Sequence, residues 1–363
     1  MTINGNGLLL DPEGASPVIQ NDRVLVPFRA IFEALSAEVF WDEQTATVTG
    51  KRGNTEIRLV IGSRTAYKNG MEIYLDAAPS IINGRTMAPL RFVAESLGAD
   101  VSWAPGARTV TITQIERFIE IKDIRIRIGD TLEYVKSLLG DADRVDPSSY
   151  DFNWHVYNSD YSRFIMVGVK NGFVEALYTN ANGFFTNGAM FGDVRTQSGS
   201  QVKLYFDSND GGRLYACLII SNDVIPKGGA GSDFFRAQEL EIFDFSNAFR
   251  ANYGLDPLEP GDDAAALTAL NHSRDMADRN YFSHNTPEGL SPMQLYKNNG
   301  GESAGTCENI AAGRLLSIDT FNDWVNSKEH RHNMLGPYNH LGVGAAYNQS
   351  SKYTYYMTQL FTI

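Results

Sequence analysis

Cysteine is scarce in this chain of 363 residues, which contains only Cys217 and Cys307. So few cysteines exclude a disulfide-stapled scaffold, and a chain of this length does not need one because it can bury sizeable hydrophobic cores. No run approaches the roughly 18 apolar residues that would span a bilayer, so no transmembrane segment is predicted. With 43% hydrophobic and 20% charged residues, the sequence is typical of a globular protein, and its length predicts two or three domains.

Positive charge is also in short supply, because 31 Lys and Arg residues face 43 Asp and Glu residues and leave a net charge of -12. This balance argues against binding to nucleic acid, or to an anionic membrane surface, through bulk electrostatics. The chain start, Met1 to Gly5, lacks the positive and apolar regions of a signal peptide. The sequence therefore belongs either to a cytoplasmic protein or to a protein whose signal has been removed.

An internal duplication is the clearest feature of the first third. The segment from Arg23 to Trp41 recurs sixty-two positions later as Arg85 to Trp103, without a gap. Each copy predicts a short strand, a helix that begins after a proline, and a hairpin. Type I′ turns are predicted at two dipeptides, Asn69-Gly70 and Asn83-Gly84.

These repeated motifs resemble the copper amine oxidase-like N-terminal domain, or stalk domain, of bacterial cell-surface proteins. The resemblance assigns residues 1–114 to a duplicated α+β domain that serves as a spacer or attachment module. No histidine precedes His155 and no cysteine precedes Cys217, so the segment lacks the ligands that copper favours. Copper is therefore not expected in this domain.

A different pattern begins at residue 115. A short helix ending at Gly140 is predicted by apolar residues at helical spacing, namely Leu132, Val135, Leu138 and Leu139. Strands are predicted at 152–157, 164–169 and 173–178, with Asn171-Gly172 as a hairpin turn, and Gly192-Asp193 suggests a second, similar unit. Residues 115–224 resemble the α+β domain that commonly precedes bacterial CAP domains. Residues 225–239, which include Pro226 to Ser232, are interpreted as a flexible linker.

The remaining segment, 240–363, contains five of the six histidines. Its apolar spacing predicts the order helix, helix, loop, helix, strand, strand. Asp262 or Asp263 is predicted to cap one helix and Ser317 another. In the first of these helices, Leu267, Leu270 and Met276 are expected to face the core.

Motifs in this segment resemble those of the CAP superfamily, the cysteine-rich secretory proteins, antigen 5 and pathogenesis-related 1 proteins. They occur in the family's order: Asn247 to Arg250, His272 to Met276, Tyr281 to His284, Glu308 to Gly313, Trp324 to Ser327, His330 to Leu335 and Leu341 to Gly344. The resemblance implies an α-β-α sandwich, so the whole chain is predicted to be an α+β multidomain protein. It also implies an extracellular or cell-surface location.

In the CAP family a polar groove holds two histidines and two acidic residues. The matching positions here are His284, Glu308 and His330, while Ser327 stands where the second acid is expected. Glu329 is close in sequence, but nothing in the sequence places it in the groove. His272 and His340 are interpreted as structural.

Three roles remain open for His284, Glu308 and His330. They could bind a divalent cation such as zinc with an open water position, shuttle protons as general acid and base, or join loops through hydrogen bonds. Cys307, beside Glu308, raises the further hypothesis of a thiolate nucleophile, and a Cys217–Cys307 bridge is a weaker one.

Two functions follow from these alternatives. The first is a binding module that presents the groove to a cell-wall component, a lipid or an extracellular protein. The second is a metal-assisted or histidine-based hydrolase acting on peptide or wall material. The sequence contains no G-x-S-x-G elbow and no H-E-x-x-H pair that would support catalysis independently, so whether the protein is an enzyme stays open.

Overall fold

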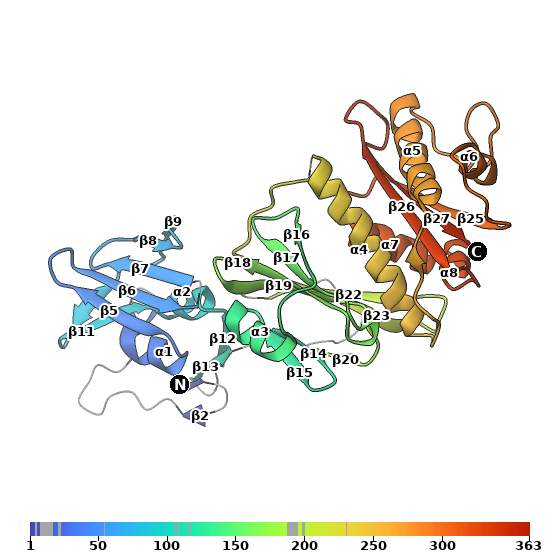
Figure 1. The fold of residues 1–363 in the computed structure, drawn as a ribbon. Helices are drawn as coiled ribbons and strands as arrows, with labels where there is room; N and C mark the ends of the chain where they lie inside the picture. Colours follow the sequence, from blue (N-terminus) through green and yellow to red (C-terminus); the bar gives the residue numbers. More distant parts are fainter. Residues whose placement is uncertain are drawn as a thin grey trace.

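Three folded regions follow one another in the computed structural model, from the blue N-terminal part to the red C-terminal part (Figure 1). The structure describes residues 1–3, 6–7, 17–20, 23–53, 55–104, 106, 109–114, 117–186, 195–197, 200–229 and 231–363. Gly192 and Asp193, where the sequence suggested a second unit, lie outside these residues. None of the described helices combines the length and the hydropathy that a membrane span requires.

The first region is the duplicated one. Its two helices, α1 (Phe28–Ala34) and α2 (Leu90–Ser96), begin directly after Pro27 and Pro89, as predicted. Its strands are β1 (Thr2–Ile3), β2 (Asn6–Gly7), β3 (Val18–Gln20), β4 (Arg23–Pro27), β5 (Glu38–Asp42), β6 (Thr47–Arg52), β7 (Thr55–Val60), β8 (Thr65–Lys68), β9 (Met71–Tyr74), β10 (Ser80–Ile82), β11 (Arg85–Pro89), β12 (Ala99–Ala104) and β13 (Thr109–Gln114).

The two copies meet at the antiparallel pair β4 and β11. Val26 pairs there with Ala88, its own counterpart in the other copy, so the duplication folds with internal two-fold symmetry. Both residues of the Asn69-Gly70 turn have positive φ, which confirms the type I′ prediction.

The middle region is built on a seven-stranded antiparallel sheet in the order β16-β17-β18-β19-β23-β22-β21, beside a smaller sheet β15-β14-β20. Helix α3 (Leu132–Leu139) ends at Gly140, whose φ is 82°, as predicted. The other elements are β14 (Phe118–Ile121), β15 (Ile124–Arg127), β16 (Arg144–Pro147), β17 (Asn153–Tyr157), the 3-10 helix η1 (Tyr161–Arg163), β18 (Ile165–Lys170), β19 (Phe173–Thr179), β20 (Phe184–Phe185), β21 (Arg195–Gln197), β22 (Ser200–Asp207) and β23 (Arg213–Ser221).

The segment expected to be a flexible linker is largely structured. The backbone of Lys227 donates to the Ser149 carbonyl at 2.8 Å, and helix α4 (Ser232–Ala251) begins well before residue 240. The linker prediction was wrong from residue 232, because Gly231 directly precedes a helix of 20 residues. Figure 1 shows α4 in yellow between the middle sheet and the C-terminal sheet.

Helix α4 joins the two regions into one hydrophobic core. The Phe245 ring lies 4.7 Å from the ring of Tyr178 in the middle sheet and 5.7 Å from that of Phe321 in the C-terminal region. All three side chains are fully or almost fully buried within a single cluster that spans both regions. Burying several aromatic rings in one shared core favours a fixed arrangement of the two regions.

The C-terminal region is an α-β-α sandwich around the sheet β24-β26-β27-β25. Alternate residues of β26 face opposite sides, with Val343 in the core shared with α4 and Ala346 in a cluster with α5 residues. Its other elements are β24 (Glu259–Pro260), α5 (Asp263–Arg279), α6 (Pro292–Asn298), β25 (Thr306–Ala312), α7 (Ser317–Asn326), α8 (Lys328–Met334), β26 (His340–Tyr347) and β27 (Tyr355–Thr362).

Two details of this region differ from the sequence predictions. Asp262 caps α5 as expected, but Leu267 is 45% exposed and not in the core. Met276 is fully buried, as expected. The rest of the inner face of α5 carries small and polar residues, because the helix packs closely over the glycines of β26: Ala265, Ala269, His272 and Ser273. Ser317 is not the cap of α7, since Leu316 holds that position and the Ser317 hydroxyl donates to buried Glu241.

Candidate functional site

Glu308 lies on β25, an edge strand of the C-terminal sheet, and only 6% of the residue is exposed. Both of its carboxylate oxygens bond to imidazoles. Oε2 lies 2.6 Å from Nδ1 of His272, and Oε1 lies 2.7 Å from Nδ1 of His284. An ionised carboxylate only accepts hydrogen bonds, so each histidine donates from Nδ1.

His272 comes from the inner face of α5 and was interpreted from the sequence as structural. The structure adds it to the cluster, which we call the His272–Glu308–His284 cluster from here on. Its side chain is fully buried, and its Nε2 atom has no hydrogen-bond partner among the described residues. The spacing from Ala265 and Ala269 to Met276 is the sequence signal that would have placed this histidine on the buried face.

His284 follows α5 after a sharp turn at Asn280, whose φ is 55°. Its side chain is 54% exposed while the bonded carboxylate is almost entirely buried. The hydrogen bond and charge of Glu308 raise the pKa of His284, although partial burial opposes this shift. The cluster therefore presents one half-exposed imidazole, that of His284, which is hydrogen-bonded to a buried carboxylate and favours its charged form.

His330 lies on α8, which packs beside β25. Its ring is 6.5 Å from that of Trp324, measured between centroids. Burial and the positive charge of His284 lower the pKa of His330, and the charge of Glu329 opposes them. His330 is therefore close enough to His284 to be affected by its charge. Among the described residues, no hydrogen bond joins the two imidazoles.

The position of the missing second acid lies at the junction of α7 and α8. Ser327 is half-buried there, and its hydroxyl lies 3.4 Å from Oε2 of exposed Glu329. Ser327 can supply a hydroxyl but no charge. Glu329 is exposed and acts on His330 through its charge.

A buried amide network ties α8 to the sheet below. Asn309 donates to the carbonyl of His330 at 3.1 Å and to Gln359 at 2.9 Å, while Asn333 donates to the carbonyl of Glu308 at 3.3 Å. Asn309 and Asn333 therefore satisfy backbone groups and fix the height of α8 over β25.

Cys307 does not have the setting of a reactive thiolate. Burial raises its pKa to about 12, against a weaker opposing effect of a hydrogen bond with Tyr338. Both cysteines are free, so Cys217 and Cys307 form no disulfide.

The donor set fits a metal ion only in part. Within the described ranges, no three His, Cys, Asp or Glu side chains are grouped as metal ligands. Glu308 already bonds to an imidazole through each oxygen, so in this structure it orients His284. Zinc held jointly by His284, Glu308 and His330 stays a prediction that this geometry does not favour.

The fold of the C-terminal region is that of a CAP domain. Residues 243–361 match the cysteine-rich secretory protein (CAP) family, 128–210 the CAP-associated N-terminal family, and 2–112 the copper amine oxidase N-terminal domain. The chain therefore carries a CAP domain preceded by a CAP-associated domain and a copper amine oxidase N-terminal domain, as the sequence motifs predicted.

Similar proteins come from Bacillus species. "Uncharacterized membrane protein YlbC" of Bacillus subtilis is 27% identical, covering 60% of this chain and 79% of that protein. "Uncharacterized protein YkwD" of the same organism is 38% identical, covering 30% of this chain and 42% of that protein. The crystal structure of an extracellular SCP-domain protein from Bacillus anthracis has a TM-score of 0.55 at 23% identity, covering 65% of this chain and 93% of that one. This last likeness concerns the fold.

Proposed function

We propose that this protein is an extracellular or cell-surface binding protein, whose CAP domain recognises a cell-wall component through His284 and His330. The observation that carries the proposal is the half-exposed imidazole of His284, which buried Glu308 holds in one orientation at 2.7 Å. A fixed polar group at the surface binds a ligand without first losing side-chain freedom. The extracellular relative with the same fold supports the location.

Co-sedimentation of the full chain with purified cell-wall sacculi tests this function. We expect His284→Ala and His330→Ala each to weaken binding about tenfold, as the loss of one hydrogen bond to a charged group would. His332→Ala is the matched control, because His332 lies on the same helix α8 and is exposed. Equal binding of all variants to sacculi would overturn the proposal. If the protein binds only to lipid vesicles or only to a secreted protein, the ligand is that lipid or protein and not a cell-wall component.

A second function, hydrolysis of peptide or wall material, is favoured by one observation. The pKa of His284 is raised while that of His330 is lowered, so one imidazole favours the charged form while the other favours the neutral form. Such a pair has the protonation states of a general acid and a general base. Release of soluble fragments from sacculi, abolished by His330→Ala and kept by His332→Ala, would support hydrolysis; no release by the wild type would exclude it for this substrate.

A further inference from the structure

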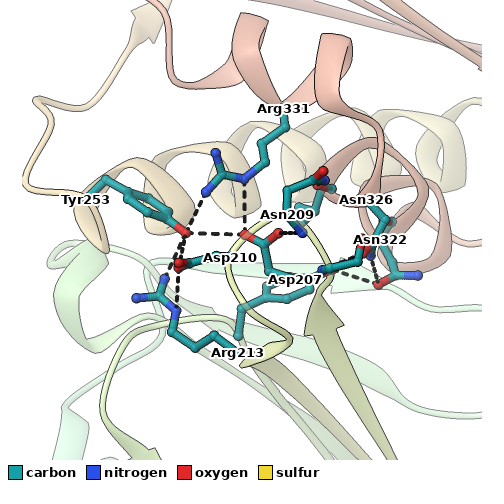
Figure 2. A network of polar contacts seen from close by, with 11 residues as sticks. Asp207, Asn209, Asp210, Arg213, Tyr253, Asn322, Asn326 and Arg331 are labelled. Carbon is teal, nitrogen blue, oxygen red and sulfur yellow. Dashed lines mark hydrogen bonds and ion pairs between the residues drawn. The ribbon is translucent and has the colours of Figure 1, made fainter.

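The tight turn between β22 and β23 of the CAP-associated domain reaches across to the CAP domain. Figure 2 shows Asp207, the last residue of β22 before this turn, facing Arg331 of α8 and Tyr253, which follows α4. Arg331 donates from Nε to Oδ2 of Asp207 at 3.1 Å and from Nη2 to the Tyr253 hydroxyl at 2.8 Å. The Asp207 side chain is fully buried, so this ion pair is shielded from water.

Other residues of the turn support the same contact. The Tyr253 hydroxyl lies 3.2 Å from Oδ2 of Asp207 and 2.9 Å from Oδ2 of Asp210, and it accepts from Arg213 at 3.1 Å. The guanidinium of Arg331 also lies 5.0 Å from the centre of the Tyr253 ring. Asp207 is therefore the buried acceptor of the network, while Asp210 bonds to Tyr253 and Arg213 and does not contact Arg331 (Figure 2).

The turn also holds the end of α7. Asn209 donates to the carbonyl of Val325 at 3.1 Å, and the backbone of Ser208 donates to Asn326 at 2.9 Å. These bonds satisfy polar groups where α7 stops and α8 begins. The CAP-associated domain thus contacts the end of α7 through Ser208 and Asn209, and α8 through Asp207, on either side of the α7–α8 junction.

Helix α8 needs such external support because it has only seven residues and its N-cap, Ser327, makes no side-chain capping bond. Helices of this length are not stable by themselves in water. On the other side, Arg250 donates to the carbonyls of Met334 and Gly336 at 3.0 and 2.8 Å. Arg331 directly follows His330, so a displacement of Arg331 carries His330 with it.

We infer that Asp207 is a positioning residue for His330: the CAP-associated domain sets the place of His330 through Arg331. This inference rests on the proposed function only in treating His330 as a ligand contact. The CAP-associated domain would then help to position His330, a role that the CAP motifs by themselves do not predict.

The test is NMR of the full chain labelled at histidine. His330 lies beside the Trp324 ring, whose ring current shifts the resonances of nearby protons. In Asp207→Ala we expect the His330 resonance to move towards its position in an unfolded chain, and α8 amides to exchange at least about tenfold faster, while α5 amides keep their protection. Asp207→Asn retains an acceptor for Arg331 and should cause a smaller displacement.

Asp210→Ala is the matched control, with the same charge change in the same turn but no lost contact to Arg331. If Asp207→Ala does not fold, Asp207→Asn and Arg331→Lys provide the same comparison. A folded Asp207 variant whose His330 resonance stays at the wild-type position, or an equal displacement in Asp210→Ala, would overturn the inference. Sacculus binding is measured separately, so a wild type that fails to bind refutes the proposed function and leaves this result intact.

Discussion

Replacing Glu308 by glutamine tests the His272–Glu308–His284 cluster directly. The carboxylate accepts one hydrogen bond on each oxygen, at 2.6 Å from His272 and 2.7 Å from His284. Glutamine has a single side-chain oxygen, so one of these bonds is lost and the new NH2 group faces an Nδ1–H donor. The substitution keeps the size of the side chain, so packing changes little.

The expected loss follows from the burial of Glu308. Leaving a buried hydrogen-bond donor unpaired costs about 1–3 kcal/mol, and more where a charge is involved, so we expect about 2–3 kcal/mol in the free energy of unfolding. For a cooperative unit of this size that corresponds to a melting temperature roughly 4–12 °C lower. Glu308→Ala should cost more, about 3–5 kcal/mol, because it removes both acceptors and leaves a cavity.

The loss should also depend on pH, with a definite sign. Glu308 raises the pKa of His284, so its stabilising effect through that group is fully present below the unfolded pKa of about 6.5. It is lost as pH rises through the folded pKa. Calorimetry should therefore find a larger difference between wild type and Glu308→Gln at pH 6 than at pH 9.

Glu329→Gln provides the matched control because that carboxylate is exposed. A change at such a position normally stays within about 0.5 kcal/mol. Unfolding of Glu308→Gln like Glu329→Gln at both pH values, or an effect of Glu308→Gln that grows as the pH is raised, would contradict this role of Glu308.

Three further predictions concern other parts of the CAP domain. Burial raises the pKa of Glu241 to about 8, so the free energy of unfolding should fall as the pH rises from 5 to 8. In denaturant titrations Glu241→Gln should make the free energy of unfolding less dependent on pH over this range. An unchanged pH dependence would exclude a protonated Glu241. Burial raises the pKa of Cys307 to about 12, so in the folded protein at pH 8 this thiol should react with a thiol reagent at least about 100-fold more slowly than in denaturant. Comparable reaction rates in the folded and the denatured protein would contradict the burial of Cys307. A Cβ on Gly344 would lie 2.2 Å from the backbone nitrogen of Leu270, so Gly344→Ala should lower the free energy of unfolding by about 1–3 kcal/mol or more. Gly106 has open space around it, so Gly106→Ala should not have this cost. Equal stability of the two variants would refute the close approach of α5 to Gly344.

Local structure was largely predictable from the sequence. The Asn69-Gly70 turn, the helix starts after Pro27 and Pro89, and the Asp262 cap all follow from the backbone preferences of a few neighbouring residues. Family motifs supplied the CAP fold. These features depend on short stretches of chain, which is why the sequence alone contains their signals.

Long-range packing was not predictable in the same way. The apolar residue Leu267 was expected in the core but is exposed, and the inner face of α5, which closely approaches the glycines of β26, carries small residues, His272 and Met276. The linker prediction failed because a glycine-rich stretch says nothing about the helix that follows it. The bond from Arg331 to Asp207 spans 124 positions and two domains, and neither residue belongs to a motif that points to the other.

The candidate site shows the same division. His284, Glu308 and His330 were found from motifs, and the structure places Glu308 in contact with His284. The role of His272 as the second partner of Glu308 depends on how α5 packs over β26 and β27, which only the fold determines.

In the proposed function, His284 and His330 form the ligand-binding face of the CAP domain. Histidine NMR of the full chain, during a titration with soluble fragments of purified cell wall, measures ligand contact at each imidazole. We expect the resonances of His284 and His330 to move together and saturate, while that of exposed His332 stays in place. Saturable binding that leaves both resonances unmoved would contradict it.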